Sequence, residues 1–347
     1  MKDTRLPDWL QKYNHVRFNP LTGQNVLVSP ARLNRKWAGA STEQCERLPA
    51  FDPTCPFCPG NQRANNDMTP KDGRFYPFYF INDTGAVVPP SDEVLASLQY
   101  EGAFHSAKIA FGICEVVVHH HRHDFTLATM PQESAVSVVN MWIQRYRELA
   151  DRAFIRSINI FENYLFGASQ KHPHNQIWAA NYISPSQKVV LGNLQGYLDN
   201  RSACMLQDIA AFEVEVKERV VWSDDHFVIV VPFWAEWPFE MMIIPMRALD
   251  SVLDMTEEEI VSFIKAYSFA IHSLNSHFGG NCPYTAGLYQ APTDGSGNGC
   301  GFFHAIFRPP VLRSIGVYKW MVGYELMASP QRDLTPERAA SLLRGED

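Results

Sequence analysis

Two long stretches of the chain carry the same features in the same order, and this repetition limits the folds that are open to it. The first reads "CEVVVHHHRHDFTLATMPQESAVSVVNMWIQRYREL" and then "INIFENYLFGASQKHPHNQIWA", and the second reads "FEMMIIPMRALDSVLDMTEEEIVSFIKAYSFAIHSL" and then "YTAGLYQAPTDGSGNGCGFFHAIFRPP". Each contains an apolar strand, a helix with an acidic first turn after Met130 or Met255, a strand, a Gly-rich loop and a strand with histidine.

A period of about 125 residues indicates an internal duplication. We therefore expect two related α+β halves, residues 1–185 and 186–347, built around β-sheet. Chance similarity of two strand-helix-strand units is the alternative.

The last strand of the first stretch begins with two histidines, in "KHPHNQIWA" at residues 171–179. Side chains alternate between the faces of a strand, so His172, His174 and Gln176 are expected to share one face. The Gly-rich loop before them, "FGASQK", could bind phosphate oxygens through its backbone amides. An exposed, merely solvated strand is the alternative, and the apolar residues that follow argue against it.

A second chemical signal is "CPFC" at residues 55–58. Two cysteines at this spacing can bind one zinc ion from a tight turn, and such a site needs two further nitrogen or sulfur ligands. The next histidines are His105 and the cluster "HHHRH" at 119–123, so a tertiary contact must complete the site. A redox-active dithiol is the rival interpretation, although no thioredoxin-like strand-helix pattern surrounds the pair.

Charge and composition exclude several classes of partner. The formal net charge of -7 provides no basic surplus for nucleic acid or for an anionic membrane. No apolar stretch resembles a signal peptide or a membrane span, because the most apolar segment, "FVIVVPFWAEWPFEMMIIP", contains charges and prolines. Seven scattered cysteines indicate reduced thiols rather than a disulfide framework. We expect a cytoplasmic protein.

Several short motifs in a fixed order resemble the galactose-1-phosphate uridylyltransferase family, a branch of the histidine triad superfamily. They are "RFNPLTGQNVLVSPARLNRKW", "CPFCPGNQRANND", "FIND", "FEN", "HPHNQIWA", "VVPFWAEWPFE" and "FRPPVLRSIGVYKWMVGYELMASPQRDLTPERAASLLR", and they span nearly the whole chain. The resemblance implies an α+β, duplicated histidine-triad fold with antiparallel sheets and flanking helices. It also implies a homodimer whose active sites are shared between subunits.

The resemblance implies a reaction in which UMP passes between UDP-hexose and hexose 1-phosphate through a covalent uridylyl-histidine. His174 matches the nucleophile, and Gln176 matches a donor to the phosphoryl oxygens. A structural zinc ion is implied, and its ligands match Cys55, Cys58, His123 and His172.

The resemblance also implies the substrate contacts. The positions that match uridine contacts are Phe80, Asn82, Asp83 and Asn163. The positions that match phosphate contacts are Gly167, Ser169, Arg32 and Arg35. The positions that match hexose contacts made across the dimer interface are Lys319, Val322, Tyr324, Glu325 and Gln331.

The chain departs from the family at several positions. A second metal, usually iron, is held in many members by one glutamate and three histidines, whereas the matching residues here are Val190, Tyr289, His304 and Ile306. We therefore predict that the second metal is absent and that His304 is a core or turn residue.

Asn175 replaces a usually small residue, and "SQK" at 169–171 replaces Ser-Asn-Pro in a shortened loop. We expect these changes to affect the phosphate site. A nucleotide-sugar hydrolase, a phosphorylase that uses the same histidine, and a non-catalytic zinc or nucleotide-binding protein stay open as alternatives.

Overall fold

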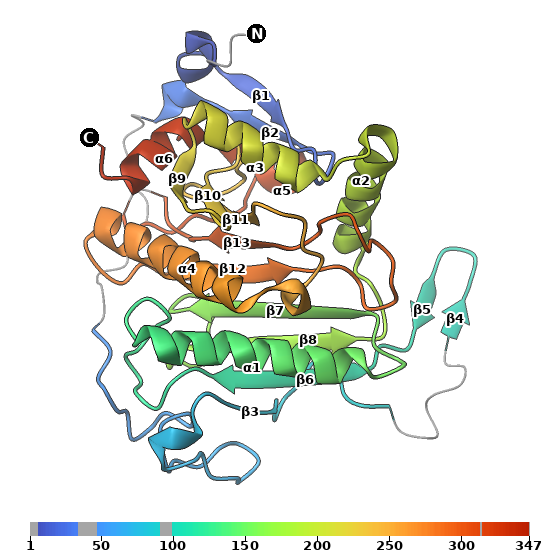
Figure 1. The fold of residues 1–347 in the computed structure, drawn as a ribbon, viewed down its shortest axis with the longest axis vertical. Coiled ribbons are helices and arrows are strands. Elements are labelled where there is room, and N and C mark those ends of the chain that lie inside the picture. The colour runs from blue at the N-terminus through green and yellow to red at the C-terminus, as the bar shows by residue number, and fades with distance from the viewer. Residues whose placement is uncertain (1–5, 34–46, 91–98, 313, 347) are drawn as a thin grey trace.

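The computed structural model describes residues 6–33, 47–90, 99–312 and 314–346. A continuous nine-stranded sheet forms its centre, with the strand order β3-β6-β8-β7-β12-β13-β11-β10-β9, and every pair of neighbours is antiparallel (Figure 1). Its strands are β3 (Phe78–Ile81), β6 (Gly112–Val118), β7 (Ser157–Tyr164), β8 (His174–Ala180), β9 (Val220–Ser223), β10 (Phe227–Val230), β11 (Met241–Pro245), β12 (Tyr284–Tyr289) and β13 (His304–Arg308).

The sheet contains the duplication that the sequence predicts. The order β3-β6-β8-β7 in the first half has its counterpart in β10-β11-β13-β12 in the second. In each half one long helix joins the second strand of the unit to the third in chain order. Helix α1 (Gln132–Ala150) joins β6 to β7, and helix α4 (Glu257–Phe278) joins β11 to β12. The two units meet where β7 pairs with β12, so they share one sheet. The predicted α+β fold with antiparallel sheet and flanking helices is confirmed.

The two long helices begin where the sequence predicts. The side chain of Thr256 accepts a hydrogen bond from the backbone N–H of Glu259 in a capping box, which satisfies free amides at the start of α4. Gly279 ends that helix with a φ of 71°, in the left-handed region that favours glycine. Both helices cover one face of the sheet (Figure 1), and their buried apolar residues belong to the largest apolar cluster among the described residues.

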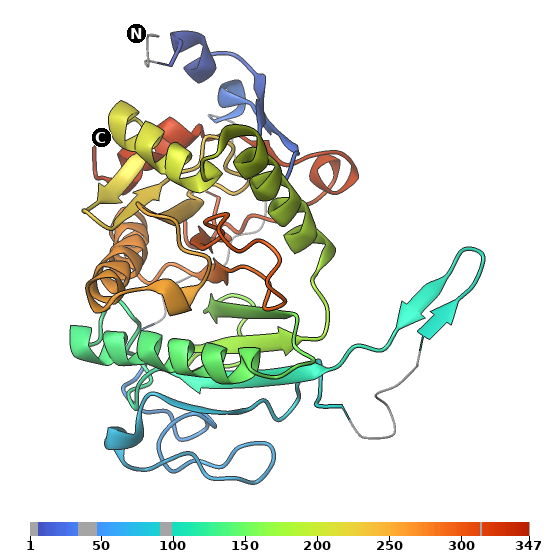
Figure 2. The same ribbon diagram turned by 45° about the vertical axis from the view of Figure 1, so that its right-hand side comes forward.

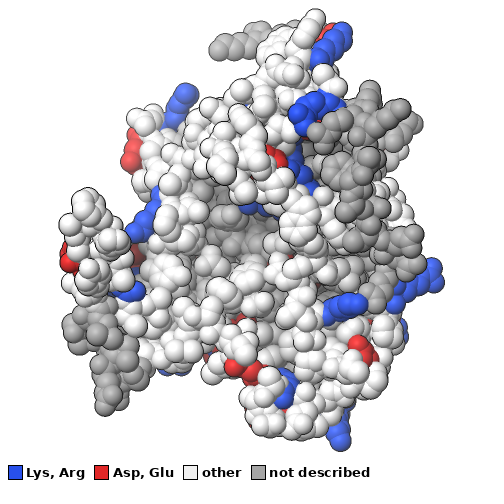
Figure 3. Space-filling view, turned by 180° about the vertical axis from the view of Figure 1, so that it is seen from behind, with Lys and Arg blue, Asp and Glu red and all other residues white. Residues whose placement is uncertain are grey.

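The opposite face of the sheet differs between the two halves. In the second half it packs against α2 (Pro185–Arg201) and α3 (Met205–Val216) in a second apolar cluster that includes Leu194, Leu206 and Ile306. In the first half a smaller cluster of Cys55, Cys58 and neighbouring residues packs there instead. Figure 3, which views the molecule from behind, shows this side hollowed near its middle.

The two ends of the chain meet beyond the edge of the second half. A small sheet has the order β1-β2-β14, formed by β1 (His15–Phe18), β2 (Asn25–Val28) and β14 (Gln331–Arg332), and only the contact between β14 and β2 is parallel. Nearby lie the short helix α5 (Tyr324–Met327) and α6 (Pro336–Leu343).

The hairpin of β4 (Gln99–Glu101) and β5 (Ser106–Lys108) projects from the body (Figure 2). Among the helices of the described residues, none combines the length and the apolar character that a membrane crossing needs. The division of the chain at 185/186 stays a prediction, since both halves contribute to one sheet.

Candidate functional site

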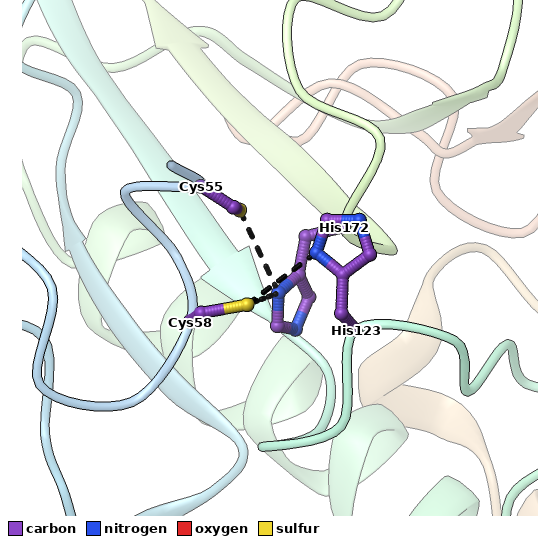
Figure 4. A group of neighbouring side chains, drawn as sticks. All are labelled: Cys55, Cys58, His123 and His172. Atoms are coloured by element: carbon purple, nitrogen blue, oxygen red, sulfur yellow. Dashed lines mark hydrogen bonds between the residues drawn. The ribbon is translucent and has the colours of Figure 1, made fainter. Parts of the chain in front are cut away.

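Four side chains from three separate segments converge beside the start of β8 (Figure 4). Cys55 and Cys58 lie on one tight turn, in which the backbone N–H of Cys58 donates to the carbonyl of Cys55 at 3.2 Å. The backbone N–H groups of Phe57 and Asp52 point at the two sulfurs, at 3.4 Å from Cys55 Sγ and 3.3 Å from Cys58 Sγ. Such N–H···S contacts favour thiolates, which are the form that binds metal.

The two histidines complete the cluster. Cys58 Sγ lies 3.4 Å from His123 Nδ1 and 3.6 Å from His172 Nδ1, and Cys55 Sγ lies 3.9 Å from His172 Nδ1. A tetrahedral zinc ion with normal bond lengths places its ligand atoms about 3.3–3.8 Å apart. All four donor atoms lie within 4.8 Å of one another, so the set fits a tetrahedral metal.

The surroundings of the cluster prepare it for a cation. His172 Nε2 lies 2.8 Å from the carbonyl oxygen of His120, so Nε2–H donates there and Nδ1 keeps its lone pair for the metal. The hydrogen bond from the Cys55 thiol is the main cause that holds the pKa of Cys58 well below its usual range despite burial. The structure therefore brings together all four residues that the sequence matched to zinc ligands, and no redox partner is needed to explain the pair.

His174, the first residue of β8, is held differently from His172. Its Nδ1 lies 2.7 Å from the carbonyl oxygen of His172, so this nitrogen carries the proton and Nε2 carries the lone pair. His174 is 5% exposed, and its ring makes a T-shaped contact with that of Phe57, with 5.0 Å between ring centroids. Burial lowers the pKa of His174 to about 4, which keeps the imidazole neutral at pH 7.

Within the described chain, the metal-binding cluster does not include His174, so this imidazole is separate from the ligands. It lines a cavity of about 150 Å³ together with Gln176. His172 precedes the strand, and its backbone connects the cluster to the histidine of the cavity.

Four of the eight residues matched to uridine and phosphate contacts line the same cavity: Phe80, Asn82, Asp83 and Ser169. Its walls are Pro56, Phe57, Arg63, Ala64, Phe80, Asn82, Asp83, Thr84, Val116, Ser169, Gln170, His174 and Gln176. Asn82 Oδ1 accepts the backbone N–H of Thr84 at 3.0 Å, which leaves the amide N–H groups of Asn82 free to donate. The wall of the cavity therefore contains a buried neutral imidazole together with several polar side chains.

Arg63 is a pocket residue that sequence reasoning did not single out. Its guanidinium lies 3.9 Å above the ring of Phe80, and it forms ion pairs with Asp83 at 3.5 Å and Asp67 at 2.8 Å. The available signal was its position five residues after Cys58 within the motif "CPFCPGNQRANND". The positive charge of Arg63 is thus partly neutralised by Asp67 and Asp83 of the same chain.

Two predicted contacts, Asn163 and Gly167, are not among the residues that line the cavity. Asn163 is on β7, and the hydroxyl of Thr285 donates to its Oδ1 at 2.9 Å. Gly167 has a φ of 71° and lies in the loop of residues 165–173, between β7 and β8. Phe166 of this loop packs against the rings of Tyr318 and Trp320, at 4.9 and 5.3 Å between centroids.

The residues matched to hexose contacts form a second pocket, of about 570 Å³. It includes Arg32, Lys319, Val322, Tyr324, Glu325 and Gln331. Lys319 forms an ion pair with Glu325, whose other oxygen accepts from Arg332 at 2.7 Å. Val322 and Tyr324 are 60% and 55% exposed, so this pocket has an open apolar rim. Arg35 lies outside the described residues.

The positions matched to a second metal are apolar or packed. Val190 and Ile306 belong to the apolar cluster under α2 and α3 and offer no ligand atoms. The ring of Tyr289 stacks on His304 with 4.8 Å between centroids, and His304 Nδ1 donates to the carbonyl of Phe302 at 2.9 Å. His304 is a buried core residue, as predicted, and the absence of iron stays a prediction.

Fold and site together define the class: a duplicated α+β protein whose two halves share one antiparallel sheet, with a Cys2His2 cluster beside a pocket histidine in its first half. The family described as "Galactose-1-phosphate uridyl transferase" matches residues 7–184 with its N-terminal domain and residues 190–346 with its C-terminal domain. The chain belongs to the galactose-1-phosphate uridylyltransferase family.

Relatives from distant organisms support this assignment. The "Galactose-1-phosphate uridylyltransferase" of Neurospora crassa is 35% identical, covering 96% of this chain and 96% of its own. The "Probable galactose-1-phosphate uridylyltransferase" of Drosophila melanogaster is 36% identical and covers 97% of this chain and 96% of its own. The protein of that family name from Haemophilus influenzae is 34% identical, covering 96% of this chain and 94% of its own.

Solved structures share the fold at lower identity. A uridylyltransferase mutant superposes with a TM-score of 0.73 at 22% identity, covering 95% of this chain and 98% of its own. An ADP-glucose phosphorylase from Arabidopsis thaliana with bound ADP-glucose gives a TM-score of 0.73 at 19% identity, with the same coverage. These likenesses show a common architecture.

Proposed function

We propose that the protein transfers UMP between UDP-hexose and hexose 1-phosphate, in a reaction of the UDP-glucose plus galactose 1-phosphate type, through a covalent uridylyl-histidine. The observation that carries the proposal is the state of His174. Its Nδ1–H donates a hydrogen bond to the carbonyl oxygen of His172, and its ring lines the cavity, so Nε2 has a lone pair available to attack phosphorus.

The reaction then takes two displacements at one phosphorus. In the first, Nε2 of His174 forms a bond to the α-phosphorus of UDP-hexose, and the bond to the bridging oxygen breaks, so hexose 1-phosphate leaves with the electron pair. In the second, a phosphate oxygen of another hexose 1-phosphate attacks, and the P–N bond breaks to restore the neutral imidazole. The proton on Nδ1 stays there throughout, hydrogen-bonded to the carbonyl oxygen of His172.

Other residues bind and orient the substrate. Gln176 donates to the phosphoryl oxygens, where one fixed donor contributes ~3 kcal/mol to a transition state. We assign uridine to Phe80, Asn82, Asp83 and Asn163, and the phosphates to Gly167, Ser169, Arg32 and Arg35. We assign the hexose to Lys319, Val322, Tyr324, Glu325 and Gln331, acting in the active site of a partner subunit in a homodimer.

We assign structural zinc to Cys55, Cys58, His123 and His172. When bound, zinc ties the "CPFC" turn to the segment that leads into β8 and so limits the motion of His174. No cysteine of the described residues forms a disulfide, in keeping with a reducing, cytoplasmic location.

Mass spectrometry of the intact protein after incubation with UDP-glucose tests the chemistry. The expected result is a uridylyl adduct that is absent from His174→Ala, together with exchange between UDP-glucose and galactose 1-phosphate. Release of UMP would instead indicate a hydrolase, and UDP formed only with added phosphate would indicate a phosphorylase. Tight binding of UDP-sugar with neither adduct nor exchange would reject catalysis.

Elemental analysis of the purified protein tests the metal. We expect about one zinc ion per chain, lost in Cys58→Ser along with a clear drop in melting temperature. Full zinc content in Cys58→Ser would overturn the assignment of this ligand, and iron at comparable occupancy would overturn the predicted absence of a second metal.

A further inference from the structure

The side chain of Gln176 must be oriented before it can assist transfer. Its two ends have nearly the same shape, but only the Nε2 end donates, whereas Oε1 would repel a phosphoryl oxygen. A half turn of the amide would therefore convert a stabilising group into a destabilising one. Gln176 is half-buried on β8 and lines the cavity, so some contact must select one orientation.

Trp178 makes that contact. It lies two residues further along β8, on the same face, and its indole Nε1–H donates to Gln176 Oε1 at 2.9 Å. An indole nitrogen can only donate, so its partner must be the amide oxygen and not the amide nitrogen. The chemistry of the pair thus fixes which end of Gln176 is engaged, and Nε2 has no other partner among the described residues.

Trp178 is itself held in position by the sheet. Its ring packs edge to face against Phe161, with 5.4 Å between centroids and 75° between planes. It lies opposite Asn159 of β7, whose Oδ1 accepts from Gln187 at the start of α2 at 2.9 Å. The indole therefore sits on a rigid part of the fold, as an orienting group requires.

Trp178 does not contact the substrate cavity directly. Of the described residues that form the cavity wall, Gln176 is the last one along β8, and Trp178 is not a member. Any effect of Trp178 on transfer must consequently pass through Gln176.

We propose that Trp178 is a positioning residue for transfer: its indole N–H holds Oε1 of Gln176 so that Nε2 faces the phosphoryl oxygens in both displacements. The inference rests on the proposed function. Loss of the contact leaves Gln176 present but free to rotate, so the effect should be smaller than the 10²–10³-fold loss seen when a fixed donor is removed. We expect kcat to fall about 10- to 100-fold, with KM for UDP-glucose changed less than about threefold.

The variant Trp178→Phe keeps a ring against Phe161 and removes the N–H. Steady-state exchange between UDP-glucose and galactose 1-phosphate, melting temperature and zinc content are measured for the zinc-loaded protein. The expected outcome is a loss in kcat with melting temperature and zinc content retained. Unchanged kcat in Trp178→Phe, with active wild-type protein, overturns the inference alone, whereas no exchange in the wild type overturns the proposed function.

A double-mutant cycle tests whether the effect passes through Gln176. If it does, Trp178→Phe causes no further loss of kcat in a Gln176→Ala background. An equal loss in both backgrounds would show that Trp178 acts by another route and would overturn the inference. Should Trp178→Phe fold poorly, a benzothienylalanine at 178 preserves the ring shape and replaces the N–H with sulfur, and the same cycle is run with it.

Discussion

Adjacent residues of β8 work on opposite faces of the sheet. His174 and Gln176 line the cavity, whereas Asn175 is buried on the side covered by α1 and α4. Its Oδ1 accepts from Trp142 Nε1 at 2.5 Å and lies 3.1 Å from His119 Nε2. The expectation that Asn175 alters the phosphate site is therefore wrong, because the alternation of the strand turns its side chain away.

Asn175 instead links β8 to Trp142 of α1 and to His119 on the covered face of the sheet. We therefore expect Asn175 to contribute to stability. In Asn175→Ala, the N–H groups of Trp142 and His119 become buried donors without an acceptor, which should lower the free energy of unfolding by about 2–4 kcal/mol. Urea unfolding of the zinc-loaded protein measures this change.

A compensating variant is the control for Asn175→Ala. Adding His119→Phe removes one of the two orphaned donors, and the double variant should recover about 1 kcal/mol or more. His119 Nδ1 is already buried without a partner, which increases the expected recovery. A loss below ~0.5 kcal/mol in Asn175→Ala would contradict the role assigned to its amide.

At this scale the sequence predicted which residues share a face, since strand alternation is a local property of His172, His174 and Gln176. It did not predict their partners. Three such contacts are Arg63 with Phe80, Trp142 with Asn175, and Trp178 with Gln176. They depend on tertiary structure or on side-chain orientation, which the identity of a single residue does not indicate.

Among the elements, the two ends of the chain are joined by a buried network of ion pairs. Glu337 of α6 accepts from Arg17 of β1 at 2.8 and 3.0 Å, and from Arg219 at 3.0 Å. The side chains of both arginines are at most 1% exposed. Burial alone would raise the pKa of Glu337, but hydrogen bonds and charge from these arginines outweigh it and lower this pKa to about 2.

This network predicts a pH dependence of stability with a definite sign. The folded-state pKa lies below the ordinary value of 4.5, so Glu337 stabilises the fold above pH 4.5, and this contribution is lost as the pH falls toward 2. Between pH 5 and pH 3 the free energy of unfolding of the wild type should therefore fall by about 2 kcal/mol more than that of Glu337→Gln.

Urea unfolding at both pH values measures the difference, and release of zinc in acid affects both proteins alike. Glu346→Gln is the matched control, because Glu346 pairs with Arg344 at the surface, where solvent screens the charge. It should follow the wild type. The same pH dependence in Glu337→Gln as in the wild type would contradict the prediction.

Element boundaries were largely predictable, because helix signals are local: Thr256 caps α4 and acidic residues fill its first turn. The joining of the two halves into one sheet was not predictable from the sequence. It depends on pairing between β7 and β12, for example Asn163 opposite Thr285, and strand pairing at such separation leaves no pattern in either segment.

The whole molecule uses one duplicated unit in two ways. His304 is the first residue of β13, and His174 is the first residue of β8. In both histidines, Nδ1 forms a hydrogen bond with the backbone carbonyl oxygen of the residue two positions earlier. In the second half, however, Tyr289 stacks on that histidine, and the sheet face packs against α2 and α3. One half has kept an open pocket, and the other uses the corresponding face as core.

Under the proposed assignment, the pocket of the first half depends on residues elsewhere in the protein for its contacts with hexose. The matched hexose residues lie in and beside α5, which Figure 1 places by β2 at the upper end of the molecule, whereas β3, which contributes Phe80 to the cavity of His174, lies at the lower end. Tyr324 and Val322 are exposed within the single chain. A second copy that presents this segment to the first copy's cavity would cover both residues and complete the site.

Mixing two inactive variants tests whether active sites are shared. His174→Ala removes the proposed nucleophile, and Tyr324→Ala truncates an exposed residue of the proposed hexose site without opening the core. If each site takes His174 from one subunit and Tyr324 from the other, every mixed dimer has one intact site. Equal mixing with full subunit exchange should then restore about a quarter of wild-type exchange activity, measured with UDP-glucose and galactose 1-phosphate. Sites built within one chain would show no activity above the two variants assayed separately, because each mixed dimer would contain only defective sites.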